Sequence, residues 1–158
     1  NDSLNDYPAL KQSVLINEER NLNGCHADDG LCKMSIFIQN RGYTRGQMIP
    51  IIIDCENFGS VDIKKIKIKL IKTIKAICTE PSRNTKSAMP DTIAEKRAAG
   101  VSRGTSNRQE VLLQIPSWAD HSNERFCKVI IIKYYIKIHC ETKWYHNAFV
   151  SEIPIEII

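Results

Sequence analysis

The feature that most constrains the fold is isoleucine that alternates with polar residues in several separate stretches of the chain. The sequence holds 24 isoleucines and only seven glycines among 158 residues. Alternation of apolar and polar residues is typical of strands with one buried face, and β-branched side chains pack well on a pleated surface. Residues 128–141 form the most continuous run of this kind. The sequence therefore predicts an all-β, immunoglobulin-like β-sandwich of seven or eight mostly antiparallel strands.

Length and composition indicate one globular domain preceded by an arm. Hydrophobic residues make up 42% of the chain and charged residues 25%, which is the balance of a soluble globular protein. Residues 1–23 are polar and contain Pro8, so we interpret them as a connector or extended arm with a short strand at 14–16. We expect residues 24–158 to form a single domain. Because the chain begins with Asn1, we also expect it to be a fragment or a processed product.

Residues 61–78 fit two kinds of secondary structure. Their isoleucines and leucine recur at helical spacing, but isoleucine and lysine also alternate from Lys65 to Leu70. The density of isoleucine disfavours a helix, because β-branched side chains lose rotamer freedom there. The sequence therefore predicts a long strand that bends near Leu70 and Ile71, where the alternation shifts as it does at a β-bulge. Lys65, Lys67 and Lys69 are predicted to face solvent.

Three further local expectations concern the remaining segments. Pro50 lies within the apolar run 48–57, which predicts an edge strand or a bulge there. Residues 79–109 read as a long loop that holds one weak strand around 94–102, because a structureless loop of this length is uncommon in a compact domain. Trp118 follows the turn at Pro116, so we predict a partly exposed side chain at a corner between a strand and a loop.

The six cysteines are too few for a disulfide framework, and no C-x-x-C pair occurs. We interpret most of them as small buried hydrophobic residues in a reducing, cytoplasmic environment. The only clustered set is Cys25, His26 and Cys32, which could form half of a zinc site if His139 or Cys140 completed it. Nothing in the spacing requires that completion, so we expect no metal and no cofactor.

No catalytic motif is present in the sequence. It contains neither G-x-S-x-G nor a glycine-rich phosphate loop. The paired carboxylates, 18–19 and 28–29, lie in polar turns where solvation explains them. His139 lies within the strongest predicted strand and is expected to be packed or edge-facing. We therefore expect a protein that is not an enzyme and has no catalytic residues.

The one functional feature that the residues themselves indicate is a row of lysines with no acidic residue among them. One interpretation is a solvated face that also hinders pairing at a strand edge. The other is a surface that binds anionic membrane headgroups or phosphorylated tails. Nucleic acid is disfavoured as a partner, because aromatic residues do not interleave with the lysines. The candidate anion- or partner-binding residues are Lys64, Lys65, Lys67, Lys69, Lys72 and Lys75.

Five segments in series carry a resemblance to a known family. They are 2–15 (D-S-L-N-D-Y-P-A-L-K-Q-S-V-L), 42–57 (G-Y-T-R-G-Q-M-I-P-I-I-I-D-C-E-N), 113–116 (L-Q-I-P), 129–138 (V-I-I-I-K-Y-Y-I-K-I) and 152–158 (E-I-P-I-E-I-I). In this order they resemble the connector and the C-terminal domain of arrestin-fold proteins, although Gln47 stands where the family usually has glutamate. The turn beginning at Tyr43 is more similar to the arrestin-domain-containing group, the α-arrestins, than to visual and β-arrestins.

The resemblance implies a fragment of a longer two-domain protein and a role as an adaptor. Family members link membrane receptors and transporters to ubiquitin ligases and endocytosis, so the implied location is cytoplasmic, peripheral to the plasma membrane or endosomes. The implied partners are receptor or transporter tails, weak anionic-lipid contacts, and a ligase reached through regions outside this chain, which has no P-P-x-Y motif. Some members bind thioredoxin through a cysteine, but no cysteine here can be matched to that role. The alternative is an extracellular or other β-sandwich binding module without a trafficking role.

Overall fold

In the computed structural model, the described residues are 6–21, 31–78, 84–122, 129–143 and 149–158. They form one short 3-10 helix, η1 (Pro8–Lys11), and ten strands. The strands are β1 (Val14–Arg20), β2 (Cys32–Ile38), β3 (Gly42–Tyr43), β4 (Met48–Asn57), β5 (Ile63–Cys78), β6 (Asn84–Ser87), β7 (Asp91–Val101), β8 (Thr105–Gln114), β9 (Ile130–Thr142) and β10 (Phe149–Ile157).

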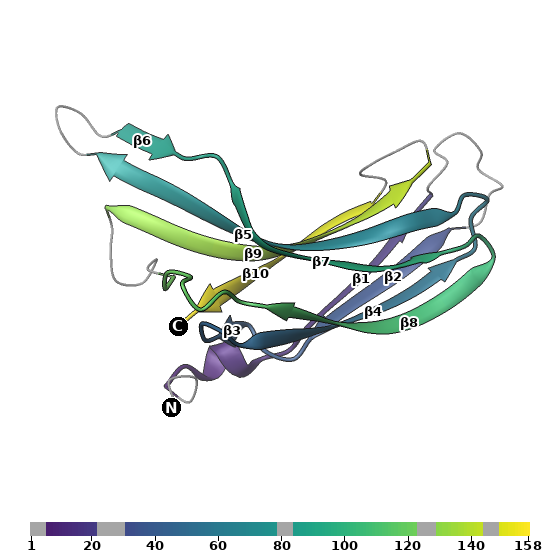
Figure 1. Cartoon of the computed structure of the whole chain (residues 1–158), viewed down its shortest axis with the longest axis horizontal. Helices are drawn as coiled ribbons and strands as arrows, with labels where there is room; N and C mark the ends of the chain where they lie inside the picture. Colours follow the sequence, from purple (N-terminus) through teal and green to yellow (C-terminus); the bar gives the residue numbers. More distant parts are fainter. Residues whose placement is uncertain (1–5, 22–30, 79–83, 123–128, 144–148) are drawn as a thin grey trace.

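The strands build two sheets that lie one above the other (Figure 1). The first sheet is antiparallel, with the order β1-β2-β4-β8. The second has the order β3-β10-β9-β5-β6, with β7 also paired to β5, and β3 pairs with β10 in parallel. The predicted all-β sandwich is confirmed. Apart from the short β3 and β6, the described residues hold eight strands, in agreement with the expected seven or eight.

The core lies between the two sheets and is built by residues that alternate along each strand. In β2, for example, the even-numbered residues from Cys32 to Ile38 are buried, whereas the odd-numbered ones are not. Ile66, Ile68 and Leu70 of β5 are fully buried in the same way on the facing sheet. Each buried aliphatic side chain of this size stabilises the fold by about 1.5–3 kcal/mol relative to an exposed one. The isoleucine alternation therefore fixes which face of each strand points inward.

The strand predicted for residues 61–78 is confirmed, but the expected shift in its alternation is wrong. β5 runs from Ile63 to Cys78, and its pairing with β9 continues in register from Lys65 to Ala76. An irregularity does occur at Leu70 and Ile71, in the pairing of β5 with β7. There Leu70 pairs with Ala94 and Ile71 with Thr92, so the extra residue is Ile93 of β7. The bulge therefore belongs to the neighbouring strand, and from Lys65 to Ala76 β5 keeps one set of residues on each face.

The segment expected to be a loop, 79–109, contains more strand than predicted. The weak strand expected at 94–102 corresponds to β7, which spans Asp91–Val101, and β8 already begins at Thr105. Most side chains of β7 and of the first half of β8 are exposed or half-buried. Edge strands of this kind bury little apolar surface and so leave little alternation in the sequence. Gly104, with φ of 73°, forms the tight turn between the two strands.

Two expectations about single residues have opposite outcomes. Trp118 is 66% exposed after β8, which confirms the predicted corner position. The prediction of an edge strand or bulge at Pro50 is wrong, because β4 lies between β2 and β8. β2 pairs with β4 only from Ile51 onward, so Pro50 lies beyond that ladder and opposes only β8, at Leu112. The missing N–H of the proline therefore does not interrupt the pairing with β2.

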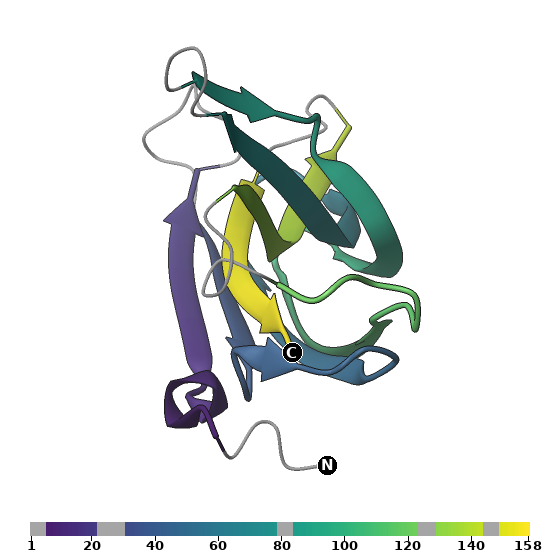
Figure 2. The ribbon, with the colours of Figure 1, turned by 90° about the vertical axis from the view of Figure 1, so that its left-hand side faces the viewer.

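The arm that precedes the domain contributes structure to it. β1 pairs with β2 along its whole length, so the short strand expected at 14–16 extends to Arg20. Leu10 of η1 is buried, and its carbonyl accepts a hydrogen bond of 2.7 Å from the backbone N–H of Arg41. Figure 2 shows β1 and β10 at the same side of the sandwich, where the Arg20 guanidinium lies 5.7 Å from the centroid of the Phe149 ring. Within the described ranges, no helix is both long and apolar enough to cross a membrane.

Asn57, the last residue of β4, is a fully buried polar side chain that holds two turns. Its Nδ2 donates hydrogen bonds to the carbonyls of Val61, at 2.9 Å, and Val101, at 3.1 Å. Its Oδ1 accepts a bond of 3.1 Å from the N–H of Gly59. The side chain therefore satisfies three backbone groups in the two turns at this end of the sandwich.

Candidate partner-binding surface

Most of the predicted lysines lie on the outer face of the second sheet. Because β5 alternates regularly against β9, Lys65, Lys67, Lys69 and Lys75 all point to that face. Two lysines of β9 join them in register: Lys137 opposes Lys69, and Lys133 opposes Thr73. We call this the basic face. Its lysines are Lys65, Lys67, Lys69, Lys75, Lys133 and Lys137.

Lys64 is exposed but stands apart from the regular row. The register of β5 against β9 is irregular between Ile63 and Lys65, so Lys64 lies at the irregularity. Its backbone is closely approached by Gly100 of β7, where an added Cβ would lie 2.6 Å from the Lys64 carbonyl oxygen. The position of Lys64 therefore depends on a local break in strand pairing, which cannot be read from the alternation of residues in the sequence.

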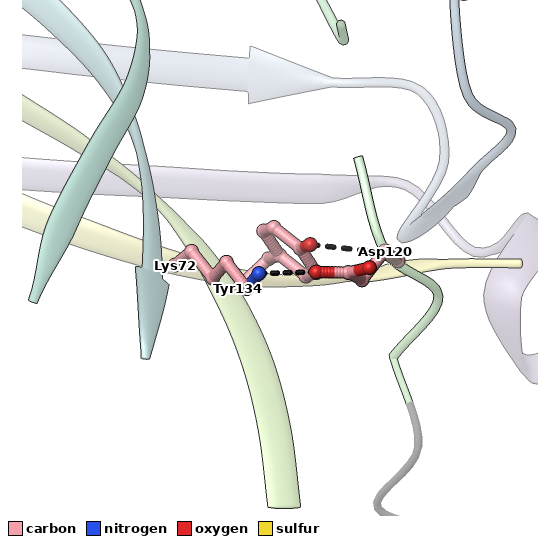
Figure 3. A network of polar contacts seen from close by, with 3 residues as sticks. All are labelled: Lys72, Asp120 and Tyr134. Atoms are coloured by element: carbon pink, nitrogen blue, oxygen red, sulfur yellow. Dashed lines mark hydrogen bonds and ion pairs between the residues drawn. The ribbon is translucent and has the colours of Figure 1, made fainter. Parts of the chain in front are cut away.

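Lys72 points to the other side of the sheet, toward the space between the layers. Its Nζ forms an ion pair with Asp120, in the segment that follows β8 (Figure 3). The hydroxyl of Tyr134 donates a hydrogen bond of 2.8 Å to the backbone carbonyl of the same aspartate. The Lys72 ammonium lowers the pKa of the Asp120 carboxyl, whereas burial and the nearby carboxylate raise the pKa of Tyr134 to about 12. Lys72 thus attaches a loop to the sheet, and the basic face does not include it.

Two pairs on the basic face differ in how their charge is balanced. Lys67 Nζ lies 2.9 Å from Glu141 Oε1, and both side chains are largely withdrawn from solvent. Lys69 and Lys137 oppose each other directly on neighbouring strands, and neither forms an ion pair with any described residue. Like charges placed directly opposite in a sheet are destabilising. Glu95 of β7 opposes Lys69 on its other side, and Glu152 of β10 opposes Lys137, so carboxylates flank this pair of like charges without forming an ion pair with it.

His139 lies on the same outer face yet is only 6% exposed. It opposes Lys67 of β5 and Val150 of β10, and its Nδ1 has no hydrogen-bond partner among the described residues. Burial lowers the pKa of His139, and so do Lys69, Lys67 and Lys137, whereas Glu141 raises it. The expectation that this histidine is packed is confirmed. Its depressed pKa comes first from burial, and the lysines of the basic face add to the shift.

Sequence reasoning identified the lysines of β5 but missed those of β9. Lys133, Lys137 and His139 follow the same period of two within the run 128–141, so they could have been assigned to one face from the sequence. What the sequence does not contain is the register that places β9 beside β5. The basic face therefore depends on pairing between strands about 60 to 70 residues apart.

Three of the cysteines lie in the core. Cys32, Cys55 and Cys140 are free and buried. The Sγ atoms of Cys32 and Cys55 lie 3.7 Å apart, and burial raises the pKa of Cys140 to about 12. In the part of the chain that the structure describes, no cluster of three or more metal-ligating side chains occurs. Of the possible half-site, Cys25 and His26 lie outside the described residues, and Cys32 packs in the core.

A cavity of about 370 Å³ lies at the end of the sandwich near η1. Charged side chains of both signs line it: Arg41 and Lys133 are basic, and Glu152 and Glu156 are acidic. Neither cysteine nor histidine contributes to this lining, so it offers no thiol or imidazole for nucleophilic or acid–base chemistry. The basic face remains the feature most suited to contact a partner.

One comparison with known proteins identifies a similar family. Residues 28–158 match the family profile described as arrestin (or S-antigen), C-terminal domain. The matched region includes every strand from β2 to β10. No curated protein matches the chain.

Proposed function

Because the chain belongs to the arrestin C-terminal domain family, we propose that it is a non-catalytic adaptor module of α-arrestin type. In this proposal it links membrane receptor or transporter cargo to trafficking and ubiquitination machinery. It acts in the cytoplasm, peripheral to the plasma membrane or endosomes. The ubiquitin ligase is reached through regions outside this chain.

The observation that carries the proposal is the basic face. This outer sheet face has a net positive charge, because its six lysines and Arg97 outnumber Glu95, Glu141 and Glu152, and that charge supports contact with an anionic membrane surface or an acidic cargo tail. Lys65, Lys69, Lys75 and Lys137 make no ion pair within the described residues, so their ammonium groups can turn to a partner. Glutamates oppose all of them except Lys75 in the sheet and lower the potential there. A basic side chain near an anionic surface contributes about 1 kcal/mol. Four such lysines provide at most about 4 kcal/mol, which corresponds to millimolar affinity at best.

Affinity of this size suits a module that works together with other contacts. It can orient an adaptor beside a membrane, but it cannot hold the protein there alone. Cargo tails and further domains would supply the remaining affinity by raising the effective concentration. Attraction between exposed charges is screened by salt, with a Debye length of about 8 Å at physiological ionic strength. The contact should therefore weaken strongly as salt is added.

Vesicle co-sedimentation tests this contact. The parent chain and the variant Lys65→Glu/Lys69→Glu/Lys75→Glu are compared on phosphatidylcholine vesicles with and without phosphatidylserine. The matched control, Lys33→Glu/Lys86→Glu/Lys96→Glu, reverses three exposed lysines outside the basic face. We expect the parent and the control to bind anionic vesicles at low salt and the first variant to lose binding. Equal sedimentation of all three proteins, or binding indifferent to salt, would contradict the role of the basic face.

A further inference from the structure

The outer face of the first sheet carries an apolar row that runs across three strands. Leu15 of β1 pairs in register with Phe37 of β2, which in turn pairs with Ile52 of β4. All three point away from the core, because the residues before and after each of them in its strand are more buried. Leu15 is 60% exposed, and Phe37 and Ile52 are half-buried.

The row continues toward one end of the sheet as a patch. Pro50 of β4 opposes Leu112 of β8. Met48 lies two residues before Pro50 in β4 and therefore on the same face. Met48 and Leu112 are more than two-fifths exposed. Apolar side chains that are grouped and exposed on one face mark candidate sites of interaction. The apolar patch consists of Leu15, Phe37, Met48, Pro50, Ile52 and Leu112.

Acidic side chains border the apolar patch on the same face. Glu110 opposes Ile52 directly, and Asp54 and Glu56 follow on β4. A groove of about 470 Å³ beside the patch is lined by Glu19, Asp54 and Glu56. Four carboxylates on this outer face stand against two cations, on Lys33 and Arg108, which gives a net charge of −2. Glu56 and Glu110 form no ion pair with any described residue.

We infer that this face docks a basic amphipathic α-helix of a partner protein. The apolar patch would receive the apolar stripe of the helix, and the carboxylates beside it would pair with lysine or arginine on the flank of the helix. The spacing fits: neighbouring strands lie about 4.8 Å apart, and a helix rises about 5.4 Å per turn. A helix laid across β1, β2 and β4 can therefore place residues i, i+4 and i+7 over the three members of the apolar row.

The charge of the face selects this occupant over two others. A second copy presenting the same face would bring two sets of unpaired carboxylates together, which repels. An anionic membrane would be repelled for the same reason. A cationic helix satisfies the apolar and the acidic parts at once. This surface is separate from the basic face, so the inference does not depend on the function proposed above.

A model peptide provides the probe. The peptide LKKLLKLLKKLLKL has an apolar stripe and basic flanks, and LEELLELLEELLEL has the same stripe with acidic flanks. Each is capped at both ends, labelled with fluorescein and titrated with the chain at low salt. We expect the basic peptide to bind at least about tenfold more tightly than the acidic one, which is a difference of about 1.4 kcal/mol.

Variants locate the site. Leu15→Gln/Leu112→Gln should weaken binding of the basic peptide at least about fivefold, because both side chains are exposed members of the patch. The control Met89→Gln changes an apolar residue that is 88% exposed outside the patch, and should leave binding unchanged. Far-UV circular dichroism checks that the variants fold. Amide shift changes on adding the basic peptide should map to β1, β2 and β4.

Three results would overturn the inference. The first is equal affinity of the parent and the Leu15→Gln/Leu112→Gln variant for the basic peptide. The second is an amide footprint on β5 and β9, which would assign peptide binding to the other sheet. The third is dimerisation of the parent in sedimentation analysis that the same double substitution abolishes, because it would make the patch an interface between copies of this chain.

Discussion

Asn57 provides the sharpest test of how the turns of this sandwich are held. All three of its side-chain hydrogen bonds go to backbone groups, and the side chain is fully buried. A buried hydrogen bond contributes about 1 kcal/mol net, so Asn57→Ala should lower the free energy of unfolding by about 3 kcal/mol. The substitution also leaves two carbonyls and one N–H without their partner, which places the expected value at the upper end of about 3–4 kcal/mol.

Asn57→Asp separates hydrogen bonding from shape, because the two side chains have nearly the same size. A carboxylate can still accept the bond from Gly59, but it cannot donate to the carbonyls of Val61 and Val101. Burying that charge against two carbonyl oxygens raises the pKa of the aspartate in the folded state. We therefore expect Asn57→Asp to be less stable at pH 7 than Asn57→Ala, by about 1 kcal/mol or more. Its stability should recover as the pH is lowered from the raised pKa of the folded state down to the ordinary aspartate pKa of the unfolded chain, about 3.9, since the protonated acid can donate once.

Urea denaturation followed by far-UV circular dichroism measures both free energies. The control Asn17→Asp makes the same change at an exposed asparagine that accepts a bond from Ser35, and should cost less than about 0.5 kcal/mol. If Asn57→Asp were as stable as the parent, or more stable than Asn57→Ala at pH 7, the donor role of Asn57 would be refuted.

Three further predictions concern other parts of the fold. Gly100→Ala should destabilise the chain by about 1–3 kcal/mol in urea, because its Cβ would lie 2.3 Å from the Ile63 carbonyl oxygen, and an unchanged midpoint would contradict that approach. His139 has a pKa below 6.5 when folded, so the unfolded chain binds more protons in the window just below 6.5 and stability falls as the pH drops through it. The free energy of unfolding should therefore fall less between about pH 7.5 and 5.5 in His139→Gln than in the parent. An identical fall in both proteins would contradict the lowered pKa of His139. The three buried cysteines should react with an alkylating reagent only in denaturant, as followed by mass spectrometry, and modification of the native protein would show that they are accessible.

The alternation and the β-branching of side chains were sufficient to predict the strands in which every second residue is buried. β5 is the clearest example, because its isoleucines fit both a helix and a strand by spacing, and only their β-branching favoured the strand. β7 and β8 were underestimated since they bury few side chains, so the physical signal on which the prediction depends is largely missing. The position of the bulge at Leu70 was predicted, whereas its assignment to β5 was wrong, because the extra residue lies on a partner strand.

The same distinction holds for the candidate surface. Alternation predicted that Lys65, Lys67 and Lys69 share a face, and they do. It could not predict that Lys75 shares the face and Lys72 does not, because that depends on whether a bulge interrupts β5. The partners of these lysines, Glu141 and Asp120, come from segments more than 45 residues away. Which lysines remain available to a ligand is therefore a property of tertiary pairing.

The two outer faces carry charge of opposite sign, and this has a consequence for orientation. Packed sheets lie about 10 Å apart, which exceeds the Debye length of about 8 Å at physiological ionic strength, so each face acts on its surroundings largely by itself. An anionic surface attracts the lysines of the second sheet and repels the carboxylates of the first. A chain held by Lys65, Lys69 and Lys75 would thus turn its apolar patch away from the membrane, where a basic helix of another protein could reach it. Contact with a membrane and contact with a partner helix are then compatible on one small domain, because they use opposite sides of the same core.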